Sequence, residues 1–320
     1  MSGKQLSIII PARNEDWLQK TIDDIFEHSE ADTEVLVGLD GYSPFLLARE
    51  NLQFFYQEKA IGQRALMNEL AHKAKGKYLM KCDAHVSFSQ GFDRIMLEDM
   101  EEDITLVPAL GNLYVYDYVC DSCACRHYQG VEPKECERCK EDRFHKELVW
   151  EINHKPIRSN FVFDTALIFQ YAPEDKEEEI NETLSIQGSG FMVSRKKYWE
   201  LGLADEAFGS WGQQGTEVAL KTWLSGGKVF CTRKAYMGHF FRTPTGFPYP
   251  ITYEKIKHAQ DYSKDIFLEN KWPKQIMPLS DLIEKFKPLP DWHNTSGEDV
   301  LKKVLEEGNK FKSGLNKPSG

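Results

Sequence analysis

The sequence has no stretch that approaches the roughly 18 consecutive apolar residues of a membrane-spanning helix. Its early apolar run, Leu6 to Ile10, is interrupted by Pro11 and Arg13, which argues against a secretory signal peptide. Positive charge is not in excess, because 40 Lys and Arg residues face 50 Asp and Glu residues and leave a net charge of −10. These absences predict a cytoplasmic protein, cellular or phage-encoded, without a membrane partner. They also argue against a broad basic surface for nucleic acid, while a local basic groove stays open.

Cysteine is scarce outside one short segment, since only Cys82 and Cys231 of the seven cysteines lie elsewhere. A disulfide framework is not expected in a chain of this size without a secretory signal, whereas two CxxC pairs twelve residues apart have the spacing of a zinc ribbon. The predicted zinc ligands are Cys120, Cys123, Cys136 and Cys139, with Cys125 and His127 in reserve. Such a zinc ion would be structural and would hold the polar excursion of residues 118–145. The alternative is a group of free or redox-active thiols.

Apolar residues are plentiful, at 41% of the chain beside 28% charged residues, which is enough for a large globular core. The first hundred residues alternate between strand and helix patterns. Strands are predicted at residues 6–10, 34–39 and 77–82, and helices from about residue 16 and over 63–74. Further strands are predicted at 161–169, 188–194 and 228–231, with a helix over 216–224. This alternation predicts an α/β fold with an open parallel sheet.

Polar side chains follow three of these strands, at residues 11–15, at Asp40 and at residues 83–85. Ligands of open parallel sheets bind beyond the carboxyl ends of the strands. Asp83 and His85 are two residues apart, so both can point to one side and hold one metal ion. His239 offers a second imidazole, and Arg242 a guanidinium that can clamp a phosphate. Taken singly, each has an ordinary alternative as a turn cap or a core histidine.

In chain order these pieces resemble the GT-A glycosyltransferases, and within them family 2 and the polypeptide N-acetylgalactosaminyltransferases. The resemblance covers about residues 5–115 and 186–250. It rests on the strand and turn of residues 6–15, on Asp40, on the DxH triplet 83–85, and on residues 211–217 and 238–242. It implies a GT-A domain over residues 1–255, Rossmann-like, with a mostly parallel central sheet flanked by helices. A zinc-ribbon-like insertion at about 118–145 would interrupt this domain, and a helical C-terminal extension over 256–320 would follow it.

The resemblance also implies a UDP-sugar donor and a manganese ion, or magnesium, held by Asp83, His85 and His239. A divalent cation together with an arginine would offset the negative charge on a departing nucleoside diphosphate. In this reading Arg242 contacts the diphosphate, Gly190 lets the donor sugar approach the backbone, and Trp211 forms a wall of the sugar site. The full set of donor-binding residues implied by the resemblance is Pro11, Ala12, Arg13, Glu15, Asp40, Arg64, Asp83, Gly190 and Arg242.

One departure from the family bears on the mechanism. Inverting family 2 enzymes have a catalytic Glu-Asp pair where this chain has Gln214 and Gly215. The polypeptide transferases, which retain configuration, have a glutamate at the position of Gln214 that touches the donor sugar. Glu217 is the nearest remaining carboxylate and is expected to support the site or to face the acceptor. Trp211, Gln214 and Glu217 are thus the catalytic candidates of a metal-dependent, retaining hexosyl- or N-acetylhexosaminyltransferase.

The acceptor hydroxyl would belong to a macromolecule, either a protein Ser or Thr or a hydroxymethylated DNA base, for which the zinc ribbon would be a docking surface. The alternative function is a non-catalytic binding module on a GT-A scaffold, but such a module would have lost its metal ligands. A nucleotidyltransferase is disfavoured because residues 11–15 contain no glycine for a phosphate loop.

Overall fold

The computed structural model describes residues 5–242 and 247–289 of the chain. Its centre is a mixed sheet with the strand order β11-β13-β6-β12-β4-β1-β2-β3. Four neighbouring strands in this order are parallel: β1 (Leu6–Ala12), β2 (Thr33–Asp40), β3 (Leu52–Gln57) and β4 (Tyr78–Cys82). Every residue of β2 and β4 is buried, as expected for strands with both faces covered.

The other part of the sheet is joined to β4 by an antiparallel pair. β12 (Gly190–Ser194) lies antiparallel to both β4 and β6 (Ile104–Cys120), and β13 (Lys228–His239) is parallel to β6. β11 (Ile180–Glu182) forms the edge. β5 (Val86–Phe88) pairs with the end of β13 and sets His239 opposite Val86. This last pairing brings the end of β13 to the segment that follows β4.

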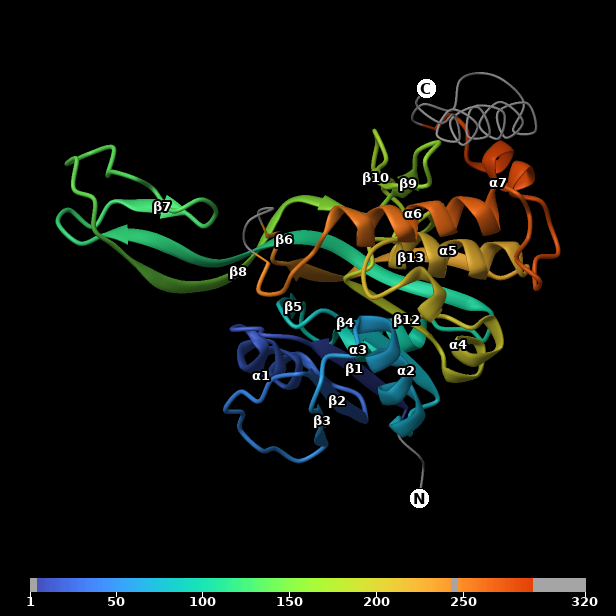
Figure 1. Ribbon diagram of the computed structural model, residues 1–320, viewed down its shortest axis with the longest axis horizontal. Coiled ribbons are helices and arrows are strands. Elements are labelled where there is room, and N and C mark those ends of the chain that lie inside the picture. Colours follow the sequence, from blue (N-terminus) through green and yellow to red (C-terminus); the bar gives the residue numbers. More distant parts are fainter. Residues whose placement is uncertain (1–4, 243–246, 290–320) are drawn as a thin grey trace, which may run out of the picture.

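Helices surround the sheet, and Figure 1 shows α5, α6 and α7 grouped in the upper part of the view. α2 packs on β1 and β2, while α5, which is buried along its whole length, packs on β6 and β13. The helices are α1 (Leu18–His28), α2 (Gln63–Lys73), α3 (Phe92–Glu98), α4 (Arg195–Leu201), α5 (Gln214–Leu224), α6 (Tyr253–Phe267) and α7 (Leu279–Phe286), with a short 3-10 turn, η1 (Glu206–Phe208).

The predicted strand and helix alternation of the first hundred residues is confirmed, although that part of the chain also contains β3, and a strand predicted later in the chain is divided in two. β3 was not predicted, because its residues are only half-buried and its sequence does not alternate cleanly. The predicted strand over 161–169 is a hairpin of β9 (Phe161–Phe163) and β10 (Phe169–Tyr171). The chain turns there because the Asp164 carboxylate accepts hydrogen bonds from the backbone N–H groups of Ala166 and Ile168.

The predicted C-terminal extension begins inside α6 and does not form a core of its own in its described part. Phe267, Leu279, Leu282 and Ile283 are buried in the same hydrophobic cluster as β1 and β2. Residues 290–320, the rest of the predicted extension, lie outside the described residues. In that described part, α6 and α7 therefore belong to the body of the domain.

The predicted excursion of residues 118–145 is the far end of a longer two-stranded ribbon. β6 pairs with β8 (Phe144–Arg158) from Leu110 to Cys120, and β7 (Arg126–Tyr128) pairs with the end of β6. Figure 1 shows this ribbon projecting from the body, with β7 near its far end. Leu113, Val115 and Tyr116 form a small apolar cluster at its base. We call residues 110–158 the arm.

Over residues 5–242 and 247–289, no helix combines the length and the apolar character needed to span a bilayer.

Candidate functional site

Two adjoining pockets lie beyond the carboxyl ends of β1, β2 and β4, because parallel strands end at the same edge of a sheet. The first pocket contains residues at all three strand ends. Its lining residues that were predicted from the sequence are Pro11, Ala12, Arg13, Glu15, Asp40, Asp83, His85 and Trp211. Asp40 also binds the start of α2, since its carboxylate accepts hydrogen bonds from the N–H groups of Ile61 at 2.6 Å and Gly62 at 3.1 Å. The first pocket is thus formed around the turn that opens α2.

The second pocket shares Gln63, Asp83 and Trp211 with the first and continues past them. It is lined further by Lys81, Gly188, Ser189, Gln213 and Gln214. Ser189 Oγ and Gln213 Nε2 are buried and have no hydrogen-bond partner among the described residues. Buried polar atoms are normally paired, so these two groups fit a polar ligand in the second pocket.

Asp83, His85 and His239 meet where the two pockets join. Their ligand atoms lie within 4.8 Å of one another, and Nε2 of His239 is 3.2 Å from Oδ2 of Asp83. Asp83 and His85 follow β4, while the pairing of β13 with β5 delivers His239. Nδ1 of His239 is buried without a partner in the described chain. One carboxylate and two imidazoles form a donor set that fits a divalent cation.

Burial and neighbouring charges set the protonation of two of these residues. Burial by itself would raise the pKa of Asp83, but Lys81 and the hydrogen bond with His239 outweigh it, and the pKa lies well below its ordinary value. Burial lowers the pKa of His239 to about 4 against the smaller opposing effect of Asp83. At neutral pH Asp83 is therefore a carboxylate and His239 a neutral imidazole, the forms that coordinate metal ions.

Glu15 connects the metal-ligand cluster to Arg242. Its Oε2 lies 2.9 Å from Nδ1 of His85, and both of its oxygens contact the Arg242 guanidinium at 2.5 Å. Burial raises the pKa of Glu15, but the hydrogen bond with His85 and the charges of His85 and Arg242 together lower it. An ionised Glu15 accepts the Nδ1–H of His85 and leaves Nε2 for a metal ion. Glu15 also lines the first pocket, so its predicted part in framing a nucleotide stays a prediction beside these contacts.

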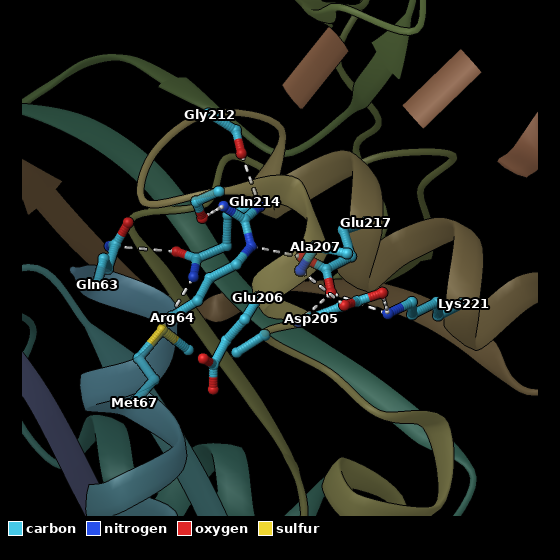
Figure 2. A network of polar contacts seen from close by, with 12 residues as sticks. Gln63, Arg64, Met67, Asp205, Glu206, Ala207, Gly212, Gln214, Glu217 and Lys221 are labelled. Carbon is cyan, nitrogen blue, oxygen red and sulfur yellow. Dashed lines mark hydrogen bonds and ion pairs between the residues drawn. The ribbon is translucent and has the colours of Figure 1, made fainter. Parts of the chain in front are cut away.

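The structure places Arg64 and Glu217 away from both pockets. Arg64 is 1% exposed and Glu217 0% exposed, and neither lines either pocket. Arg64 Nε donates to Glu217 at 3.1 Å, and the other guanidinium nitrogens donate to backbone carbonyls. Figure 2 shows the two side chains facing each other inside the domain. Arg64 is thus not among the residues that line the first pocket, where it was predicted to frame uridine. Of the two roles expected for Glu217, its position fits support of the site and not contact with an acceptor.

Gly190 also has a different part from the one predicted. A Cβ at this position would lie 2.7 Å from Sδ of Met237, so a protein side chain already fills the space assigned to the sugar. Gly188, two residues earlier, lines the second pocket. The glycine at 190 serves the packing of Met237 against β12.

Trp211 lines both pockets, which fits its predicted part as a wall of the sugar site. Gln214 lines the second pocket, where its Oε1 accepts a 3.4 Å hydrogen bond from Gln63 and its Nε2 lies 2.9 Å from Sδ of Met67. These contacts orient the Gln214 amide.

Lys81 is a site residue that the sequence analysis missed. It is 1% exposed, lines the second pocket, forms an ion pair with Asp83, and donates to the Gly188 carbonyl at 2.6 Å. A lysine inside an otherwise apolar buried strand, two residues before a DxH triplet, was the available signal.

The cysteine cluster lies at the far end of the arm. Sγ of Cys120 is 3.5 Å from that of Cys139, and Sγ of Cys123 is 3.5 Å from that of Cys136. The four sulfurs lie within 4.8 Å of one another, and all four cysteines are free thiols. A second group of possible ligands, Cys125 and His127 with Cys136, lies beside them. The spacing prediction of a four-thiol cluster is confirmed as an arrangement of side chains.

Residues 7–122 match the family model of Glycosyl transferase family 2. Polypeptide N-acetylgalactosaminyltransferase 3 of Drosophila melanogaster is 21% identical over 260 residues, which is 76% of this chain and 36% of the fly protein. Human N-acetylgalactosaminyltransferase 7 is 29% identical over 122 residues, 34% of this chain and 18% of the human protein. The chain thus spans about a third or less of the length of these curated relatives.

A crystal structure of GalNAc-T7 with UDP, GalNAc and Mn2+ has the same fold, with a TM-score of 0.60 and 17% identity, and the match covers 97% of this chain and 58% of that chain. The GT-A fold expected from the sequence motifs is therefore confirmed. These matches show that the chain has the GT-A fold, that its residues 7–122 match Glycosyl transferase family 2, and that its sequence is similar to those of polypeptide N-acetylgalactosaminyltransferases.

Proposed function

We propose that the protein transfers a sugar from a UDP-sugar to a hydroxyl group of a macromolecule, that the reaction depends on manganese or magnesium, and that it retains the configuration of the sugar. The observation that carries this proposal is the cluster of Asp83, His85 and His239 at the junction of two pockets. A donor with a diphosphate between its nucleoside and its sugar fits two pockets that meet at a cation site.

In this proposal the first pocket holds the nucleotide and the second holds the sugar. A divalent cation at Asp83, His85 and His239 would supply positive charge against the departing diphosphate. Glu15 fixes the orientation of His85 and holds Arg242 at the edge of the site, and Lys81 adds a buried positive charge beside Asp83. Trp211 lines both pockets and so lies where the nucleotide and sugar parts of the donor would meet.

Retention is proposed because the second pocket offers no group suited to act as a base. Among the described residues that line it, Asp83 is the only carboxylate, and it belongs to the cation cluster. Gln214 carries an amide, which cannot take the proton of an acceptor hydroxyl as a carboxylate can. The donor phosphate is then the group that takes the acceptor proton. NMR of the product identifies the anomer, and an inverted anomer would overturn this part of the proposal.

A protein hydroxyl is the acceptor favoured by the relatives, whose names describe polypeptide transferases. A hydroxymethylated DNA base remains the other predicted acceptor. Ser/Thr peptides and hydroxymethylated duplexes, offered separately with the same donor, distinguish the two. The cytoplasmic location likewise stays a prediction from the sequence.

We further propose that the four thiols of Cys120, Cys123, Cys136 and Cys139 bind one structural zinc ion. Pairs of thiols at 3.5 Å leave room for a metal ion with tetrahedral sulfur ligands. The pKa of Cys136 is lowered, and the largest cause is the hydrogen bond with His127. A lowered pKa favours the thiolate that zinc requires. The zinc ion would brace the end of the arm.

The donor and the metal requirement are tested together by incubating the protein with manganese and a panel of nucleotide sugars and measuring release of free nucleoside diphosphate. We expect slow hydrolysis of one UDP-sugar that stops in EDTA and in Asp83→Ala. Absence of release from every donor, with and without peptide or DNA acceptors, would favour the non-catalytic binding module. All three residues of the cation cluster are present, which argues against that module.

A further inference from the structure

A short segment, residues 209–212, forms the boundary between the two pockets. Ser210 and Trp211 line the first pocket, and Trp211 and Gly212 line the second. The segment is bent at both ends by glycines in the left-handed region, with φ of +82° at Gly209 and +98° at Gly212. Its shape therefore depends on what holds the two glycine backbones, because glycine itself imposes no conformation.

One buried side chain holds both ends of this segment. Arg64 donates from Nη1 to the Gly209 carbonyl at 3.1 Å and from Nη2 to the Gly212 carbonyl at 2.6 Å. Figure 2 shows the guanidinium of Arg64 directed at the Gly212 carbonyl on one side and at Glu217 on the other. A planar guanidinium with a fixed arrangement of donors sets the distance between two carbonyls, which the single ammonium of a lysine cannot do.

Arg64 is in turn fixed by its surroundings. Its Nε binds Glu217, which also accepts from Lys221 Nζ at 3.0 Å and from the backbone N–H of Asp205 at 2.8 Å. The guanidinium carbon lies 4.9 Å from the centre of the Phe208 ring. Because these charged groups are buried, they have no water to exchange with, and their mutual arrangement is rigid.

Backbone packing closes the segment from two sides. A Cβ at Gly62, where α2 begins, would lie 2.9 Å from Cβ of Ser210. A Cβ at Gly212 would lie 3.3 Å from Cβ of Ala259 in α6. The segment thus fits between α2 and α6, and the Arg64 hydrogen bonds determine how Trp211 stands within that space.

We propose that Arg64 is a positioning residue that fixes the segment 209–212, and with it Trp211, at the boundary between the nucleotide and sugar pockets. The effect of this positioning on turnover rests on the proposed function. Loss of Arg64 releases the segment, so the sugar is held less well, while the strand-end residues that form the rest of the first pocket are untouched.

The test uses Arg64→Met combined with Glu217→Met, because removing both charges leaves neither partner of this pair buried alone, while Lys221 keeps its ion pair with Asp205. Hydrogen–deuterium exchange of the full chain measures the segment directly. We expect exchange over residues 209–213 to rise by roughly tenfold or more, with β1 and β4 unchanged, and a smaller rise in Arg64→Lys. Arg94→Met, which removes a half-exposed arginine paired with Glu30 and Glu98, is the matched control and should not change exchange in this segment.

Enzyme activity is the second property measured in the same variants. UDP affinity should change little, whereas release of UDP from the UDP-sugar should fall roughly tenfold or more, with Arg64→Lys in between. Unchanged exchange in the double variant, or a loosened segment with unchanged turnover, would overturn the proposal. If the unmodified protein releases no UDP from any donor, the proposed function fails, but the exchange result still decides whether Arg64 holds the segment.

Discussion

The carboxylate of Glu15 and the imidazole of His85 are 2.9 Å apart, and this contact links the turn after β1 to the metal-ligand cluster after β4. Because Glu15 also binds Arg242, three segments far apart in sequence share one carboxylate. Such a contact fixes which nitrogen of His85 faces the metal ion. Glu15 is therefore expected to control metal affinity without touching the metal.

Glu15→Gln tests this expectation. The amide keeps the size of the side chain but lacks the charge, so His85 is held less firmly and manganese affinity should fall by about 10- to 100-fold. Titration of the protein with manganese by electron paramagnetic resonance gives the affinity. Glu30→Gln, at an exposed pair with Arg94, is the control and should bind manganese like the unmodified protein. Equal affinity in Glu15→Gln would show that His85 needs no such support.

Acid should destabilise the metal-free protein through His239. Its pKa is about 4 in the folded chain and near 6.5 when unfolded, so the unfolded chain binds the extra proton between these values and stability is lost as the pH falls from 6.5 towards 4. The lowered pKa of Asp83 acts in the same direction below pH 4. Between pH 7.5 and 5 the His239 contribution is about 2 kcal/mol.

Urea unfolding in EDTA at the two pH values measures this loss, and His239→Asn should reduce the difference between them. A loss of the same size in both proteins would mean that His239 is not the group responsible.

Glu217→Ala should be among the most destabilising substitutions in the described chain. It leaves the buried guanidinium of Arg64 without its anionic partner, which costs about 3–5 kcal/mol. Glu98→Ala removes one of the two partners of the half-exposed Arg94, and because surface pairs contribute little, it should cost about 1 kcal/mol or less. Chemical denaturation of both variants compares them, and equal costs would contradict the buried ion-pair account.

Zinc removal should affect the arm and leave donor hydrolysis intact. We expect about one zinc ion per chain by elemental analysis, lost in Cys136→Ser. Cys82→Ser, a substitution of a buried thiol outside the cluster, is expected to keep the zinc. Retention of zinc in Cys136→Ser, or its absence from the unmodified protein, would argue for free thiols.

Much of the fold was predictable because its signals are local. The apolar run of β1, the helical spacing of α2 and the polar residues at strand ends each lie within a dozen residues. The DxH triplet was found for the same reason. His239 was noted from the sequence only as a second imidazole, and its place at the same metal ion was implied by the family resemblance, since only the pairing of β13 with β5 brings it near.

The assignments that failed depend on where a side chain points. Arg64 is on the face of α2 that packs against α5, and one helical position decides whether an arginine meets a ligand or a buried glutamate. Gly190 was read as space for a sugar, but Met237, distant in sequence, occupies that space. Lys81 was missed although its place in a buried apolar strand, two residues before the DxH triplet, was a local signal.

Binding of UDP in the presence and absence of manganese tests the central claim most directly, because it needs neither the sugar nor the acceptor to be known. Calorimetry should show UDP binding in manganese that weakens by roughly 100-fold or more in EDTA and in Asp83→Ala. Binding of the same strength in all three conditions would contradict a donor site built on Asp83, His85 and His239.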